Sequence, residues 1–339
     1  MKLTFKIFLS CFSFLISGNI AAQEVIPTYS DYLTDNLYLL HPSMAGASNM
    51  NKLRLTARQQ WFDVEDAPSL QTLSLHARLG EKIGVGGIVF NDQNGNFSRR
   101  GVYATFAYHL LFSRSELDLN QLSFGISGGL IQHSLDQSGF SGFDPLIGNG
   151  RASDFYGNMD VDASYYYFNF FAHLTAKNIL SVEREDFYSD AVPANQRKYL
   201  FSTGYVIETY KRFWSFEPSI MFQLREATAE KTIDLNLKAY RELESGSFFG
   251  GISYRRSFEG AEYTTDGTEI KNQQLQYLTP FAGFEYKNFL FAYTYSQQFN
   301  SVVMSNSGFH QITLGYNFGK NRGRYECYCP GVNQTRKRR

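Results

Sequence analysis

Residues 53–61 read LRLTARQQW, and the side chains alternate between two faces along the whole stretch. One face carries Leu53, Leu55, Ala57 and Trp61, together with Gln59. The other face carries Arg54, Thr56, Arg58 and Gln60. A period of two residues is typical of a β-strand that separates an apolar from a polar environment, because successive side chains point to opposite faces. The stretch therefore predicts a strand with one face in each environment.

The same alternation recurs along the chain in segments of about ten residues, the length of a strand that crosses a bilayer. The segments KIGVGGIVF at 82–90 and NFFAHLTAKNIL at 169–180 are counted with the other alternating segments. Together they predict about fourteen strands. Stretches rich in Gly, Asn and Asp at 91–96, 144–150 and 264–269 are typical of chain reversals. We expect the longest strandless stretches at 134–157, 182–196 and 257–275.

Two all-β architectures use such a pattern. A water-soluble sandwich turns its polar faces outward, whereas a membrane barrel turns its apolar faces to lipid. Nearly the whole chain forms one strand array, the polar faces are rich in uncharged residues, and tyrosines lie near strand ends, where membrane barrels carry aromatic girdles. These features favour an antiparallel, up-and-down transmembrane β-barrel in the outer membrane, with the soluble sandwich as the alternative.

The segment FWSFEPSIMFQL at 213–224 tests which face is inside. If Trp214 and Phe216 face lipid, Glu217 faces the lumen, where its charge costs little. A charged side chain facing hydrocarbon at mid-membrane would cost about 2–4 kcal/mol. Pro218 lacks a backbone N–H, so we expect a bulge or another irregularity beside it.

The two ends of the chain lie outside the barrel array. Lys2 and Lys6, an apolar run from Ile7 to Ile16 and a small-residue exit at Ala22 predict a signal peptide over residues 1–22. We then expect a periplasmic N-terminal segment at 23–50, the barrel at 51–319 and a periplasmic C-terminal tail at 320–339. An even number of strands places both ends on one side.

Composition and motifs exclude several classes of function. The chain has 32 basic and 32 acidic residues, so it carries no net positive charge that would favour binding to nucleic acid. The histidines are scattered without metal-ligand spacing, and we expect no metal, no cofactor and no small-molecule substrate. GISGG at 125–129 places Ser127 in a G-x-S-x-G pattern, but inside an alternating strand, so we expect no enzyme. Cys327 and Cys329 form a possible thiol pair in the tail or a bond to a partner's cysteine.

Several motifs in the N-terminal third occur in a fixed order. They comprise an apolar segment with a Pro and a small corner, a strand ending in R-x-Q-W, an A-P-x-x-Q-T entry and an N-D-x-x-G hairpin. The matching positions are His41, Pro42, Ser43, Ala45, Gly46, Arg58, Gln60, Trp61, Ala67, Pro68, Gln71, Thr72, Asn91, Asp92 and Gly95. In this order the motifs resemble the PorP/SprF family of type IX secretion barrels, in which Asn and Ala usually stand where this chain has His41 and Ser43.

The resemblance implies an outer-membrane component of the type IX protein secretion system. It implies partners in the secretion machinery and a secreted cargo, such as an adhesin for gliding motility at the cell surface. A general porin or solute channel is the first alternative and an outer-membrane enzyme the second. In this reading LYLLHPSMAG at 37–46 is a segment packed at or inside the periplasmic mouth, the alternative being a disordered leader. We expect an occluded lumen, filled by tyrosines and long loops, and binding through loops and rim.

Overall fold

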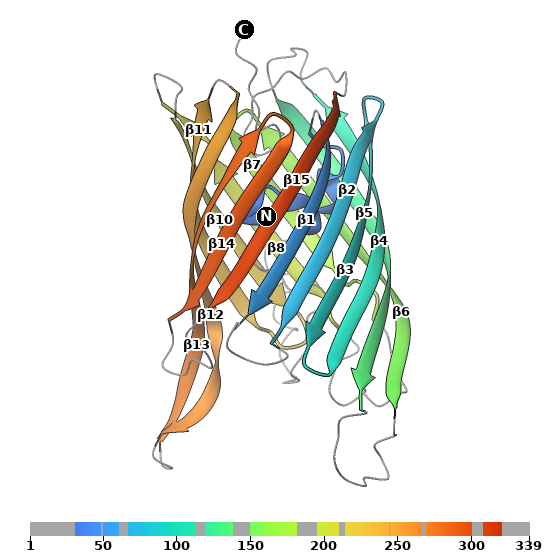
Figure 1. Ribbon diagram of the computed structural model, residues 1–339, viewed down its shortest axis with the longest axis vertical. Coiled ribbons are helices and arrows are strands. Elements are labelled where there is room, and N and C mark those ends of the chain that lie inside the picture. Colours follow the sequence, from blue (N-terminus) through green and yellow to red (C-terminus); the bar gives the residue numbers. More distant parts are fainter. Residues whose placement is uncertain are drawn as a thin grey trace, which may run out of the picture.

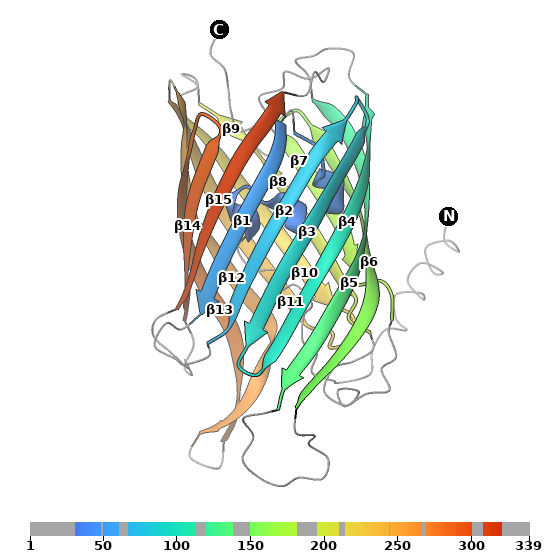
Figure 2. The same cartoon turned by 45° about the vertical axis from the view of Figure 1, so that its right-hand side comes forward.

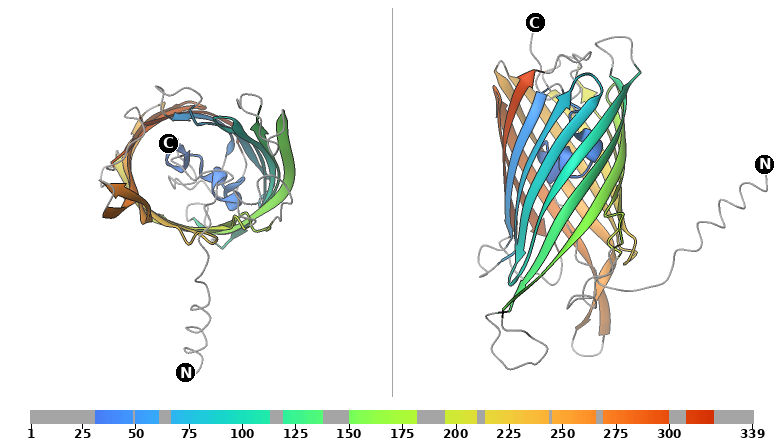
Figure 3. Two further views of the ribbon diagram at one scale, coloured as in Figure 1. Left: turned by 90° about the horizontal axis from the view of Figure 1, so that it is seen from below. Right: turned by 90° about the vertical axis from the view of Figure 1, so that its right-hand side faces the viewer.

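The computed structural model is a closed β-barrel with a short N-terminal segment inside it (Figures 1 and 3). The residues that it describes are 31–48, 50–60, 67–112, 119–137, 150–181, 195–209, 214–243, 245–265, 269–299 and 308–320. The expected signal peptide at 1–22 and all but Lys320 of the expected tail at 320–339, with Cys327 and Cys329, lie outside the described residues. Within the described residues, no helix is both long enough and apolar enough to cross a membrane.

The wall consists of strands that pair antiparallel with their neighbours in chain order. Their bounds are β1 Met50–Gln60, β2 Ser69–Leu79, β3 Ile83–Asn94, β4 Phe97–Leu111, β5 Asn120–Asp136, β6 Arg151–Tyr167, β7 Phe170–Lys177, β8 Lys198–Tyr205, β9 Ile207–Glu208, β10 Trp214–Arg225, β11 Lys231–Leu243, β12 Gly246–Thr265, β13 Glu269–Tyr286, β14 Phe289–Gln298 and β15 Phe309–Lys320. β1 pairs with β15, which closes the barrel. Because β8 and β9 both pair with β10, the wall has fourteen strands, and the predicted number is confirmed.

The predicted faces are confirmed as well. Along β1 the side chains of Arg54, Thr56 and Arg58 are buried toward the lumen, whereas Leu55 is 45% exposed on the outside. β2, β4, β5 and β15 repeat the pattern, with apolar residues outward. An apolar outer surface of this extent is stable only in contact with lipid, and a closed barrel leaves no strand edge unpaired there.

The two ends of the barrel differ. At one end, which we call the turn end, β1 begins and β15 ends, and tight turns at 80–82, 168–169 and 287–288 join neighbouring strands. At the other end, the loop end, the connections include the longer segments 137–150, 178–197 and 299–308. Figure 2 shows β12 and β13 extending beyond the other strands at the loop end.

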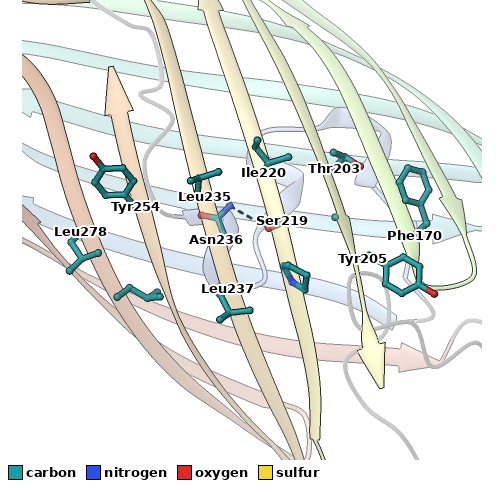
Figure 4. Close-up of a pocket in the computed structure, with 13 residues that line it drawn as sticks. Phe170, Thr203, Tyr205, Ser219, Ile220, Leu235, Asn236, Leu237, Tyr254 and Leu278 are labelled. Atoms are coloured by element: carbon teal, nitrogen blue, oxygen red, sulfur yellow. Dashed lines mark hydrogen bonds between the residues drawn. The ribbon is translucent and has the colours of Figure 1, made fainter. Parts of the chain in front are cut away.

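The strand irregularity expected beside Pro218 is present. Opposite it, β8 ends at Tyr205 and pairing resumes at Ile207 in the same register, so the strand is interrupted rather than bulged. Glu217 faces the lumen, as predicted, and accepts a hydrogen bond from Tyr240 Oη at 2.7 Å. On the outside, this part of the wall is hollowed into a shallow groove of about 590 Å³ (Figure 4). Its lining includes the labelled Tyr205, Ile220 and Leu235.

Two of the expected strandless stretches contain strands. In the stretch 134–157, β5 continues to Asp136 and β6 begins at Arg151. In the stretch 257–275, most residues belong to the paired strands β12 and β13. The 257–275 expectation was wrong because this hairpin projects past the wall (Figure 1). Outside the wall both faces of a strand meet water, so no apolar alternation is needed.

Residues 31–48 lie in the lumen (Figure 3), and we call them the plug. They form three 3-10 helices, η1 Asp31–Thr34, η2 Leu37–Leu39 and η3 Pro42–Met44. These helices pack against β4, β5, β6, β13 and β14. Thus the lumen is occupied by the N-terminal segment, where we had expected tyrosines and long loops.

Candidate functional site

The plug holds its own backbone in short hydrogen-bonded turns. The amides of Leu40 and His41 donate to Leu37 O at 3.0 and 2.9 Å, and the amide of Ala45 donates to Pro42 O at 3.0 Å. Pro42 opens η3, where a missing N–H costs no helical hydrogen bond. Short turns therefore satisfy many backbone groups locally, which a segment inside a closed lumen requires.

The first anchor of the plug is a buried carboxylate. Asp35 Oδ1 lies 3.0 Å from Lys52 Nζ, and Asp35 Oδ2 lies 2.7 Å from Arg54 Nη2, both on β1. The same Arg54 nitrogen donates to Asn317 Oδ1 on β15 at 2.7 Å. Burial by itself would raise the pKa of Asp35, but the charges of Lys52 and Arg54 hold it at about 2. Asp35 is therefore ionised at neutral pH, and it ties the plug to β1 directly and to β15 through Arg54.

The second anchor is apolar. Tyr38, Leu39 and Met44 pack in one buried cluster with lumen-facing side chains that include Phe90 and Tyr103. Tyr38 Oη donates to Thr105 Oγ1 at 2.7 Å, so its polar end is satisfied too. The cavities that remain beside Asp35 measure about 40 and 20 Å³. The plug is thus packed against this part of the wall with little free space.

The third anchor joins η3 to β6 and β7. The amide of Ser43 donates to Asp162 Oδ1 at 2.6 Å, and the Ser43 hydroxyl lies 2.5 Å from Ser164 Oγ. His41 Nδ1 lies 2.6 Å from Thr175 Oγ1, and its ring stacks on His173 with centroids 4.4 Å apart. His41 and Ser43 therefore make specific contacts with the wall.

Acidification should loosen the plug through His41. Burial, followed by the nearby His173 and Lys177, lowers the pKa of His41 well below its usual range. The folded pKa lies below the unfolded value of about 6.5, so the stabilisation is complete above that pH and is lost as the pH falls below it. We expect hydrogen exchange at the His41 amide to accelerate as the pH falls below that value, after correction for the intrinsic pH dependence.

The variant His41→Asn is the control for this effect. It retains side-chain donors and acceptors but cannot be protonated in this range, so the acid-dependent loss should become smaller. The charged and titratable groups that face position 41 include His173, Lys177 and, through Ser43, Asp162. An equal acid response in both proteins would contradict the assignment to His41.

The Ala45–Gly46 corner fits because the wall residues that lie closest to the plug backbone here, Gly84 and Gly125, have no side chain. Gly46 has φ +67°, and its amide donates to His76 Nδ1 at 3.1 Å. A Cβ on Gly84 of β3 would lie 1.9 Å from Ala45 O, and a Cβ on Gly125 of β5 would lie 2.1 Å from the Ser43 nitrogen. The wall therefore approaches the plug backbone more closely than any other residue would allow.

Gly125→Ala should displace the plug and leave the wall in place. We expect a loss of about 1–3 kcal/mol in plug stability, the usual cost of overpacking a filled site. Limited proteolysis within residues 31–48 of the folded barrel measures it. The matched control in the same strand is Gly128→Ala, since a Cβ at Gly128 meets nothing within 4 Å. Equal proteolysis of the two variants would show that Gly125 has no role in seating the plug.

The structure does not bring the other predicted family-motif residues into this anchor region. Arg58 and Gln60 point into the lumen near the loop end, and the amide of Gln60 donates to Pro68 O at 2.9 Å. Asn91, Asp92 and Gly95 lie around the β3–β4 turn, where Asp92 pairs with Arg99 at 2.5 Å. Trp61 lies outside the described residues.

Ser127 is in the interior of β5, as predicted, 2.6 Å from Thr105 Oγ1. Among the described residues, no group of three His, Cys, Asp or Glu side chains is placed to hold a metal ion.

Sequence reasoning singled out His41 and Ser43 but missed several other residues that anchor the plug. Asp35, Lys52, Asp162 and Lys177 were not singled out, although the last three stand on the polar face of their strands. Lys177 Nζ lies 3.2 Å from Asp160 Oδ2 and donates to Leu39 O at 3.0 Å. A charged side chain on a lumen face was an available signal, because such a charge needs a partner when the lumen is filled.

A closed fourteen-strand barrel with an apolar outer surface and a polar lumen defines the chain as a transmembrane barrel of the outer membrane. The family model described as "Type IX secretion system membrane protein PorP/SprF" matches residues 21–316. The chain belongs to this family, and it is therefore a membrane component of the type IX secretion system, associated with that machinery.

Two solved structures that resemble the chain have low sequence identity to it. The TodX ΔS2S3 mutant, titled a monoaromatic hydrocarbon channel, has 12% identity and a TM-score of 0.48, with 84% of this chain and 94% of that chain covered. BamA from Haemophilus ducreyi, lacking POTRA domains 1–3, has 8% identity and a TM-score of 0.43, with 80% and 70% covered. No curated protein matches the chain.

Proposed function

We propose that this protein assists the secretion or the surface anchoring of specific cargo, such as a gliding adhesin, and that it does so without enzymatic activity. In this proposal the turn end faces the periplasm, because outer-membrane barrels have short periplasmic turns and longer extracellular loops. The loop end, with the projecting β12–β13 hairpin, is then the surface available to cargo outside the cell.

The plug is the observation that supports this proposal over a general porin. A porin needs a water-filled passage, whereas here an ion-paired and packed segment occupies the lumen. A buried carboxylate held by two cations is costly to displace. Cargo contacts at the loops and rim, rather than permeation through the lumen, are therefore the function proposed.

Deletion of the gene, followed by proteomics of the cell surface, tests the proposal. We expect one large surface protein, or a small set of them, to be lost while bulk type IX export continues. Complementation with the natural chain should restore the lost proteins, and complementation with an unrelated outer-membrane barrel should not. Loss of all exported proteins would indicate a general translocation role, and an unchanged surface would contradict the proposal.

A further inference from the structure

The outside of the wall carries a shallow groove beside Pro218, which has no role in the function proposed above. It measures about 590 Å³, and its described lining comes from β7, β8 and β10 to β13 (Figure 4). Tyr205, Leu235 and Leu237 line it and are 51%, 49% and 50% exposed on the outside of the barrel. Since the outside of the wall meets lipid, the groove opens into hydrocarbon.

Small residues adjoin one another in the lining of the groove. Gly204 of β8 is paired with Ser219 of β10, and Pro218 precedes Ser219 along β10. The outward side chains of Ile220 and Leu235 beside them are larger. A void would lose van der Waals contacts on its open side, so the hollow favours an occupant that follows its shape. Lipid tails are as apolar as leucine side chains, so this fit decides what binds.

Two polar groups of the lining have partners within the wall. Thr203 Oγ1 donates to Phe171 O at 2.9 Å. Asn236 Nδ2 donates to Ser219 Oγ at 3.3 Å, a contact that is dashed in Figure 4. An occupant therefore does not need to supply hydrogen bonds to these groups, and a hydrocarbon chain suits them.

The groove extends over about one leaflet of the bilayer. One end is at the turn end, where β7 begins at Phe170 and β8 ends at Tyr205. The other end is at Leu278, eight residues from Tyr286, where β13 ends. At about 3.3 Å per residue and a strand tilt of about 40°, eight residues rise roughly 20 Å. Half of the hydrocarbon core is about 15 Å thick, so a chain in the groove would extend from the headgroup level to mid-membrane.

A positive charge lies on the turn-end side of the groove. Arg241 is exposed on the outward face of β11, four residues beyond the groove residue Leu237, or roughly 13 Å along the strand. Its guanidinium carbon lies 5.4 Å from the centre of the Trp214 ring. Tryptophan is enriched at the headgroup level of membranes. The charge of Arg241 complements a lipid phosphate, which guanidinium groups bind well.

We propose that the groove binds an acyl chain of one membrane phospholipid, whose phosphate lies beside Arg241. The groove is continuous with the lipid-facing wall, its shape suits a flexible chain, and Arg241 supplies the charge for the headgroup. It holds this lipid longer than the flat wall around it holds other lipids. The proposal is independent of the secretion role, which would stand if the groove held no particular lipid.

Native mass spectrometry of the full-length protein in detergent tests the proposal. The probes are 1-palmitoyl-2-oleoyl-phosphatidylglycerol and glycerophosphoglycerol, which is the same headgroup without acyl chains. We expect one phospholipid to stay bound per barrel at detergent concentrations that remove all others, and the headgroup alone to bind at least tenfold more weakly. Absence of a retained lipid would overturn the proposal and favour an apolar segment of a partner protein as the occupant. Equal binding of the headgroup alone would also overturn it.

Substitutions locate the bound lipid. Ile220→Trp fills part of the groove and should weaken phospholipid binding at least tenfold. The matched control is Ile126→Trp, since Ile126 is 44% exposed on β5, which contributes nothing to the described lining. Heat-modifiable migration on gels checks that each variant keeps a closed barrel. Equal phospholipid binding by these two variants would overturn the proposal.

The headgroup contact is tested separately. Arg241→Gln should weaken phospholipid binding about threefold, because the acyl chain still fills the groove. Arg100→Gln should leave binding unchanged, since Arg100 is on the β3–β4 hairpin and hydrogen-bonds Asn91 at 2.8 Å. An affinity that Arg241→Gln did not change would overturn the placement of the phosphate beside Arg241.

Discussion

Deletion of residues 31–48 is expected to convert a closed barrel into a conducting one. The deletion leaves β1 and all other strands intact, and it removes the segment that occupies the lumen. The exposed lumen face is polar, so water and ions should fill it. In planar bilayers the full-length protein should show no steady conductance, and the deleted protein should show stable single-channel steps. Liposome swelling in sugar solutions should follow the same order.

A locked plug is the matched control for the conductance experiment. The hydroxyls of Ser43 and Ser164 lie 2.5 Å apart, so Ser43→Cys together with Ser164→Cys is suited to a disulfide between plug and wall. The oxidised double variant should remain closed, with any brief openings of the natural protein abolished. Steady sugar permeation through the full-length protein would contradict the occluded lumen and favour the porin alternative.

Replacement of Asp35 by Ala is expected to release the plug. Lys52 and Arg54 would remain at the wall without the carboxylate that both contact, and breaking a buried pair in this way costs about 3–5 kcal/mol. The free energy of plug opening is measured by native-state hydrogen exchange at the amides of Leu40 and His41, which are hydrogen-bonded to Leu37. Their protection should fall by roughly a hundredfold or more, since 1.4 kcal/mol corresponds to a factor of ten.

The control for Asp35→Ala is Glu230→Gln. Glu230 pairs with Arg225 at 2.7 Å, but the two side chains are 32% and 29% exposed. Such a pair contributes less than about 1 kcal/mol, so the plug amides should keep their protection. If both variants behaved alike, the buried contacts of Asp35 would not be what holds the plug.

The wall could be predicted from the sequence because its pattern is local. Each strand separates lipid from a polar lumen, so LRLTARQQW and its counterparts alternate with period two and show both the strand and its faces. Pro218 and Glu217 were placed correctly for the same reason. The 257–275 hairpin was not, since it lies where no such contrast acts on its two faces.

The position of the plug was harder to predict because its contacts are distant in sequence. Thr34 meets Thr313, Tyr32 meets Asp234 and Ser43 meets Asp162, and no periodicity within residues 31–48 records these partners. The apolar LYLL and the small Ala45–Gly46 corner indicated packing at or inside the mouth of the barrel. Which wall residues receive them depends on how fourteen strands close, which no local motif contains.

The position of Asp35 also bears on how the molecule is assembled. Closure joins the first strand to the last, which requires residues about 260 positions apart to meet, a step with a high entropic cost. Arg54 contacts Asp35 and Asn317 at once, so the plug is in place on the side where the first and last strands meet. We therefore expect insertion of the plug and sealing of the cylinder to be a single cooperative event during biogenesis, so that an unsealed intermediate would also be an unplugged one.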